Sequence, residues 1–92
     1  MNAQSKDGFY FRMHGDAMQD AGINDNDLLW VKTNAVPQEG DTILAQVDHD
    51  MLVRKFFLDN GQVILMAENV NMPSILIEEE SEFQVCGVVE KL

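Results

Sequence analysis

Apolar and polar residues alternate in the first part of the chain, over residues 8–13. Phe9, Phe11 and Met13 fall on one side of an extended backbone, and residues 10, 12 and 14 fall on the other. This two-residue period is that of a half-buried strand. It predicts a strand over residues 8–13 that runs into a sharp turn at Gly15.

The later apolar runs are short and are separated by turn residues. They predict further strands at residues 28–31, 41–47, 51–58, 63–67, 75–77 and 83–89. Asn60 and Gly61 favour a tight turn whose twist matches its flanking strands, and residues 48–50 are a second hairpin signal. We expect one helical turn, at residues 17–21, with Asp16 as its cap and Gly22 at its end. The pattern therefore predicts a mainly β fold of short antiparallel strands and hairpins, with at most one or two helical turns.

Composition limits the class of protein. The chain has 92 residues, of which 46% are hydrophobic, and this length suits one domain. We expect a flexible N-terminal segment at residues 1–8 and one domain over residues 9–92. Sixteen acidic residues against six basic ones give a net charge of −10, which argues against direct binding of nucleic acid. A single cysteine, Cys86, is typical of a reducing compartment. No apolar run reaches ~18 residues. We therefore expect a cytoplasmic protein without membrane contact.

Several short motifs, taken together, resemble the peptidase domain of the LexA/UmuD family. They are FRMHGDAM at 11–18, GINDNDLL at 22–29, GD at 40–41, VRK at 53–55, EN at 68–69 and GVV at 87–89. The family includes SOS-response and phage repressors and the UmuD subunit of a translesion polymerase. The resemblance covers nearly the whole chain and implies a LexA/UmuD-type fold of strongly twisted antiparallel strands.

The resemblance also implies a catalytic pair, and both of its positions depart from the family pattern. Family members cut their own linker with a serine and a lysine, stimulated by a RecA filament. The serine position holds Ala17, and the lysine position holds Arg54. Alanine has no nucleophilic atom, and arginine stays protonated and cannot act as a general base. Lys55 is the alternative base, but neighbouring side chains on a strand point to opposite faces.

Two interpretations of Ala17 follow. Arg54 favours a natural, catalytically inactive domain that acts as a dimerisation and protein-interaction module in SOS or phage repressor regulation or in translesion synthesis. The alternative is a self-cleaving enzyme trapped by a serine-to-alanine change at Ala17. The family cleaves at dipeptides such as Ala-Gly or Cys-Gly, and neither precedes Gly8 in this sequence.

Partners and other sites complete the expectations. The resemblance implies a homodimer, and its interface is expected to use Phe83, Val85, Val88 and Val89. A RecA filament, a translesion polymerase or an active family member are further candidate partners. We expect no cofactor. We also expect no metal site, because the two histidines and their acidic neighbours lack ligand spacing; the residues concerned are His14, Asp16, Asp48, His49 and Asp50.

Overall fold

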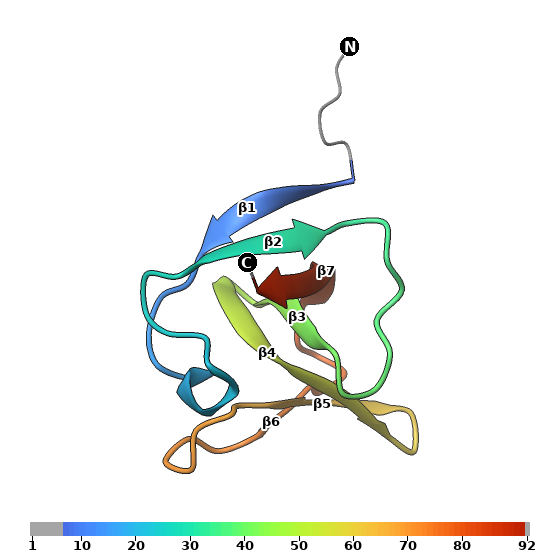
Figure 1. Ribbon diagram of the computed structural model, residues 1–92. Helices are drawn as coiled ribbons and strands as arrows, with labels where there is room; N and C mark the ends of the chain where they lie inside the picture. Colours follow the sequence, from blue (N-terminus) through green and yellow to red (C-terminus); the bar gives the residue numbers. More distant parts are fainter. Residues whose placement is uncertain (1–6, 92) are drawn as a thin grey trace.

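Seven strands form one antiparallel sheet, which confirms the predicted mainly β fold. The computed structural model describes residues 7–91 (Figure 1). The sheet order is β1-β2-β7-β3-β4-β5-β6. The strands are β1 (Gly8–Arg12), β2 (Leu28–Lys32), β3 (Thr42–Val47), β4 (Asp50–Asp59), β5 (Gln62–Met66), β6 (Ile75–Leu76) and β7 (Phe83–Lys91). One 3-10 turn, η1 (Gln19–Ala21), lies between β1 and β2.

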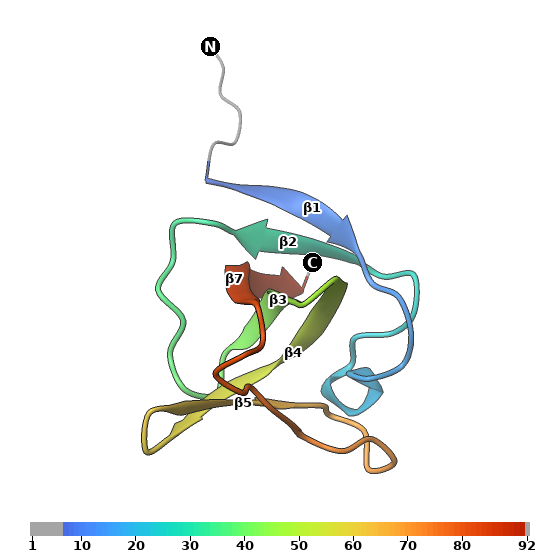
Figure 2. The ribbon, with the colours of Figure 1, turned by 180° about the vertical axis from the view of Figure 1, so that it is seen from behind.

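Strand β7 joins the two halves of the sheet. It pairs with β3 from Phe83 to Val88 and with β2 from Val88 to Lys91. Its register against β3 shifts between Leu44 and Ala45, where Cys86 of β7 is the extra residue of a bulge. The two opposite views show β7 between β2 and β3, with the sheet curling around it (Figures 1 and 2). A bulge bends a strand and increases its twist, which helps the sheet to curl.

The core has two apolar clusters, and β3 contributes to both. Leu44 belongs to the first cluster, with Leu29 and Val31 of β2. Ile43 and Ala45 belong to the second, which also contains Phe56 and Leu65. Successive strand residues point to opposite faces, so a strand covered on both faces carries a continuous apolar run. The three adjacent residues 43–45 are fully buried for this reason.

The two predicted hairpin turns are present. Asn60 and Gly61 both have positive φ values, 52° and 83°, between β4 and β5. This backbone conformation is the one that suits a two-residue hairpin turn. Residues 48–49 connect β3 to β4, and Asp48 has a φ of 54°.

The helical turn is shorter than expected, and the prediction that Asp16 caps it with its side chain is wrong. Met18 occupies the N-cap position, and no side chain caps the turn. Asp16 instead accepts a hydrogen bond from the backbone N–H of Gln19 through its carbonyl oxygen, at 3.2 Å. Gly22 ends the turn as predicted, with a φ of 81°.

The N-terminal part of the domain differs in detail from the expectation. Gly8 belongs to β1, and Asp7 accepts a hydrogen bond from the backbone N–H of Thr33. The rest of the segment 1–8, residues 1–6, lies outside the described residues. Phe9 was expected on the buried face, but it is 38% exposed because β1 is an edge strand covered only in part. Over residues 7–91, the structure contains no helix with the length and hydrophobicity that a membrane span requires.

Candidate functional site

The turn after β1 is held against the loop that precedes β2. The backbone N–H of Gly15 donates to the Asp25 carboxylate at 2.7 Å, and Gly15 has a φ of 87°. The backbone N–H of Met13 donates to the carbonyl oxygen of Asp27 at 2.8 Å. These bonds fix the direction in which the chain leaves β1. They place Ala17 at a buried position, where it is 4% exposed.

A second set of hydrogen bonds reaches this turn from the loop after β5. The backbone N–H of Glu68 donates to the carbonyl oxygen of Ala17 at 2.8 Å. The side-chain amide of Asn69 donates to the carbonyl oxygen of Asp16 at 2.9 Å, and its oxygen accepts from the backbone N–H of Asn71 at 2.9 Å. Asn69 is 7% exposed, so its side chain forms both bonds from a buried position. It is a positioning residue for Asp16 and Ala17.

The role of Asn69 was missed in the sequence. Glu68 and Asn69 contributed to the family resemblance, but nothing in the sequence predicted a hydrogen-bond partner for the side-chain amide of Asn69. Asp16 lies 53 positions earlier in the chain, so no local pattern connects the two residues. The one signal was a short polar residue next to a loop, which is common on any protein surface.

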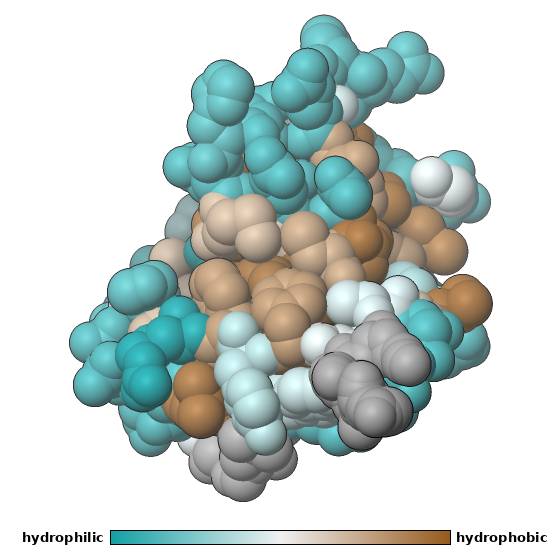
Figure 3. All heavy atoms as spheres, turned by 90° about the horizontal axis from the view of Figure 1, so that it is seen from above, coloured by the Kyte–Doolittle hydropathy of each residue, from teal (hydrophilic) through white to brown (hydrophobic). Residues whose placement is uncertain are grey.

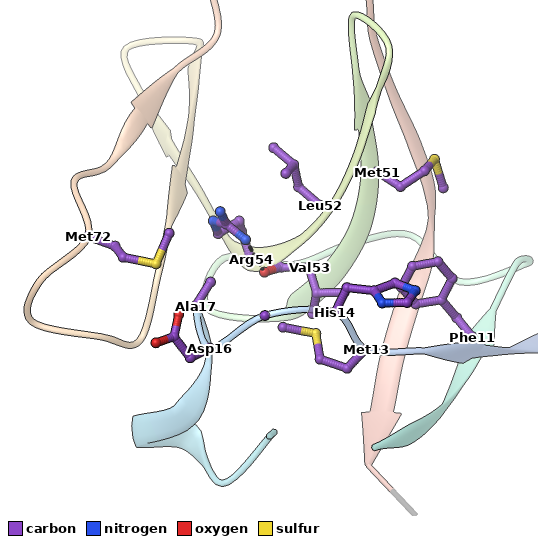
Figure 4. A pocket seen from close by; sticks show the side chains of 11 residues that line it. Phe11, Met13, His14, Asp16, Ala17, Met51, Leu52, Val53, Arg54 and Met72 are labelled. Carbon is purple, nitrogen blue, oxygen red and sulfur yellow. Dashed lines mark hydrogen bonds between the residues drawn. The ribbon is translucent and has the colours of Figure 1, made fainter. Parts of the chain in front are cut away.

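Ala17 and Arg54 line the same pocket, which has a volume of about 420 Å³ (Figure 4). The turn contributes His14, Gly15 and Asp16 to its lining. The other lining side chains are apolar: Phe11, Met13, Met51, Leu52, Val53 and Met72. The structure therefore brings together the two positions that the resemblance singled out, in mainly apolar surroundings.

Arg54 lies in this pocket as a buried cation. It is 8% exposed, and its Nη1 donates to the carbonyl oxygen of Val53 at 2.9 Å. Its Nε is buried and has no hydrogen-bond partner among the described residues, and no described acidic side chain forms an ion pair with it. Burial lowers the pKa of Arg54 because it disfavours the charged form. Arginine begins so high on the pH scale that it remains protonated at neutral pH.

Lys55 does not line the pocket. Its Nζ lies 3.7 Å from the Glu68 carboxylate, and both side chains are about one-third exposed. Lys55 thus has the opposite surroundings from those that make a lysine a base, which are burial and the absence of a counterion.

The remaining candidate residues are dispersed. His14 is exposed at the pocket, with its ring 6.4 Å from that of Phe11, and His49 lies in the exposed turn between β3 and β4. No three His, Cys, Asp or Glu side chains within residues 7–91 are grouped as metal ligands would be. Cys86 packs against the first core cluster, and burial raises the pKa of its thiol, an effect opposed by a backbone hydrogen bond involving Gln46.

The expected interface residues of β7 are half-buried. Phe83, Val85 and Val88 pack against the second core cluster, and Val89 packs against the first. Strand β7 pairs with β3 over residues 83–88 and with β2 only over residues 88–91. Within the part of the chain that the structure describes, the backbone of residues 83–87 is therefore unpaired on the side that faces β2. Apolar side chains also gather on the face seen in Figure 3. Phe9, Tyr10 and Leu28 are exposed on β1 and β2.

The fold and the pocket define a class of protein. It is a mainly β domain in which a turn and a neighbouring strand form one mainly apolar pocket, lined by the two positions that the resemblance singled out, Ala17 and Arg54. Comparison with known proteins agrees: the Peptidase S24-like family model matches residues 1–90. The chain belongs to this family, whose activity is that of a serine autopeptidase.

Curated relatives carry the name LexA repressor. The chain is 34% identical to the protein of Caldicellulosiruptor saccharolyticus over 89 residues, which are 96% of this chain and 44% of the relative. It is 35% identical to that of Oleidesulfovibrio alaskensis over 81 residues, 88% of this chain and 39% of the relative. It is 36% identical to the protein of Geobacter metallireducens over 89 residues, which are 95% of this chain and 44% of the relative. The chain thus spans about two-fifths of the length of these relatives.

Proposed function

We propose that this chain is a catalytically inactive LexA/UmuD-type domain that acts as a dimerisation and protein-interaction module. The observation that carries the proposal is the pocket shared by Ala17 and Arg54, in which neither the serine nor the lysine of the family's catalytic pair is present. Relatives named as repressors favour a role in repressor regulation of the SOS or phage type. An accessory role in translesion synthesis is the other setting in which such a domain fits.

The nucleophile is the first missing component. No residue that lines the pocket has a hydroxyl or a thiol, and a methyl group stands at position 17. Cys86 is packed against the core and is absent from the pocket lining. A raised thiol pKa leaves less thiolate at neutral pH, and the thiolate is the reactive form. The side chains of this pocket therefore offer no hydroxyl or thiol to attack a peptide carbonyl.

The general base is the second missing component. A serine–lysine pair requires a lysine that burial keeps neutral, so that it can accept the serine proton. Arg54 has the burial but keeps its proton. Lys55 is partly exposed and forms an ion pair with Glu68, so it lacks the burial that this role requires. Restoring the serine alone is thus expected to leave the pocket without the neutral lysine that the pair requires.

Two revertants test this proposal. Each is incubated with a linker peptide that contains Ala-Gly, at neutral and mildly alkaline pH, and products are measured by mass spectrometry. Ala17→Ser alone should give no cleavage, and Ala17→Ser with Arg54→Lys should cleave. Adding Lys55→Met to the double revertant should leave cleavage unchanged. Cleavage by the unaltered chain would refute the proposal, and cleavage by Ala17→Ser alone would favour the trapped autopeptidase.

Association is the function that remains for an inactive domain. The half-open backbone of β7 and the exposed apolar side chains of β1 and β2 give surfaces on which a second copy or a partner could bind. The net charge of −10 makes DNA contact by this domain unfavourable. Sedimentation equilibrium should give twice the chain mass of 10.4 kDa. A mass that stays at the monomer value as concentration rises would exclude self-association.

Binding to partners is tested separately. The chain, immobilised, is exposed to RecA filaments, to a translesion polymerase and to an active family member, each purified. Selective retention of the polymerase or of RecA would favour the accessory role. Retention of the active family member would favour regulation by mixed dimers.

A further inference from the structure

The buried charge of Arg54 lacks the counterion that buried arginines ordinarily have. The guanidinium carries five N–H donors in a fixed fork, and the described residues give it one hydrogen bond, to Val53. Its buried Nε has none. A buried charge is stable only when it is paired, and carboxylates fit the guanidinium fork best. Arg54 therefore has donors available for a carboxylate that enters its pocket.

The pocket around Arg54 has the properties of a ligand site. Its volume of about 420 Å³ lies within the range of ordinary ligand pockets, about 300–1,000 Å³. Apolar side chains dominate its lining, so a carboxylate that binds there must be carried on an apolar group. Asp16 is the one acidic side chain of the lining; it is exposed and forms no ion pair with Arg54. It leaves the guanidinium free for an anion from outside.

The backbone beside the pocket favours a peptide as the carrier of that carboxylate. Strand β4 pairs with β3 from Asp50 onward, but it pairs with β5 only from Lys55 onward. Residues 51–54 therefore have a strand on one side only, and these same residues line the pocket. An extended peptide can add to such an edge through main-chain hydrogen bonds. Figure 4 shows this part of β4, with Arg54 pointing into the pocket above Ala17.

We propose that the pocket binds the free C-terminal carboxylate of an apolar peptide, with Arg54 as the anion-binding residue and residues 51–54 of β4 as the docking edge. The inference rests on the proposed function, because a bound peptide must remain uncut. The site that processes a peptide in active relatives would here retain one by its end. The carboxylate would replace the missing counterion and use the unpartnered donors of Arg54.

The test compares two forms of one probe, the tetrapeptide acetyl-Ala-Val-Leu-Ala, by isothermal titration calorimetry. One form has a free C-terminal carboxylate and the other a C-terminal amide. A hydrogen bond between charged groups contributes enough to binding for about a tenfold to hundredfold difference in Kd. We expect the free acid to bind more tightly by that factor. Equal affinity of the two forms would overturn the proposal.

Three variants identify the residue responsible. Arg54→Met should reduce the acid-to-amide ratio to about one, and Arg54→Lys, which keeps the charge but loses the fork, should retain part of it. Lys55→Met removes the same charge next to the pocket and should retain the full ratio. If Lys55→Met weakened binding as much as Arg54→Met, the effect would be a general attraction between charges, and the site would be refuted. Circular dichroism establishes that each variant is folded.

Two further measurements separate the alternatives. Hexanoate carries a carboxylate on an apolar chain but cannot pair with a strand edge, so it should bind more weakly than the peptide. Equal affinity would overturn the assignment of a peptide. Mass spectrometry of the titrated samples shows whether the peptide is intact. A cut peptide would refute the proposed inactivity, whereas an intact peptide with no preference for the acid would refute this inference alone.

Discussion

Replacing Arg54 by methionine should make the protein more stable. The two side chains are similar in length, and methionine has no donor that must be satisfied in the pocket. A buried donor without a partner costs about 1–3 kcal/mol, which the variant recovers. The variant also loses the hydrogen bond from Arg54 to Val53, worth about 1 kcal/mol. The expected net gain is about 1 kcal/mol, or a rise in Tm of about 4–8 °C for a domain of this size.

The assay is urea unfolding followed by the fluorescence of Trp30, the one tryptophan of the chain. The midpoint should rise while the dependence of the unfolding free energy on urea stays constant, since the surface exposed on unfolding hardly changes. Lys55→Met is the matched control: it changes the net charge equally but removes a partly exposed ion pair, so its effect should lie within about 1 kcal/mol. A lower midpoint for Arg54→Met would show that the guanidinium is satisfied in the free protein. It would then remove the physical basis of the carboxylate site.

Three other perturbations test separate parts of the structure. Asn69→Ala should cost about 1–3 kcal/mol in urea unfolding, because the carbonyl of Asp16 loses its buried donor; an unchanged midpoint would show that this bond is not needed. Gly87→Ala would place a Cβ atom 2.5 Å from the carbonyl oxygen of Lys32, so it should lower the Tm by forcing β7 away from β2, and a Tm equal to that of the parent would contradict this packing. The raised pKa of the Cys86 thiol predicts stability that is fully present below the ordinary thiol pKa of about 8.5 and is lost as pH rises through the folded-state pKa; Cys86→Ala should flatten this part of a pH–stability profile.

The strands could be predicted from the sequence because their signals are local. The apolar run at residues 28–31 predicted β2, but the run alone does not say which side chains are buried; in the structure Leu29 and Val31 are fully buried between more exposed neighbours. The turn at Asn60 and Gly61 could also be predicted, because these two residues favour the positive φ values that the turn requires. The ends of the strands differ from the prediction by one or two residues: β2, β4 and β7 are longer, and β1, β3 and β6 are shorter.

What the sequence could not supply depends on residues far apart in the chain. The position of β7 between β2 and β3 depends on the tertiary arrangement, so no pattern within residues 83–91 specifies it. The hydrogen bond from Asn69 to Asp16 has the same character. Asp16 was predicted to cap the helical turn because of its residue type. The turn begins later, and Gln19 donates a hydrogen bond to the backbone carbonyl of Asp16, not to its side chain. The missing counterion of Arg54 is a property of its surroundings, which only the fold defines.

The place of β7 in the sheet has a consequence for the order of folding. A chain that has emerged from the ribosome only as far as β6 can form the hairpins of β1 with β2 and of β3 with β4 and β5, since these are local. It lacks β7, the strand that pairs with both β2 and β3, so the packing of Leu44 against Leu29 and Val31 has no main-chain pairing to hold it until β7 arrives. Until then the apolar faces of both hairpin units stay exposed to other nascent chains. Synthesis of β7 is therefore the step at which two aggregation-prone units become one cooperative domain.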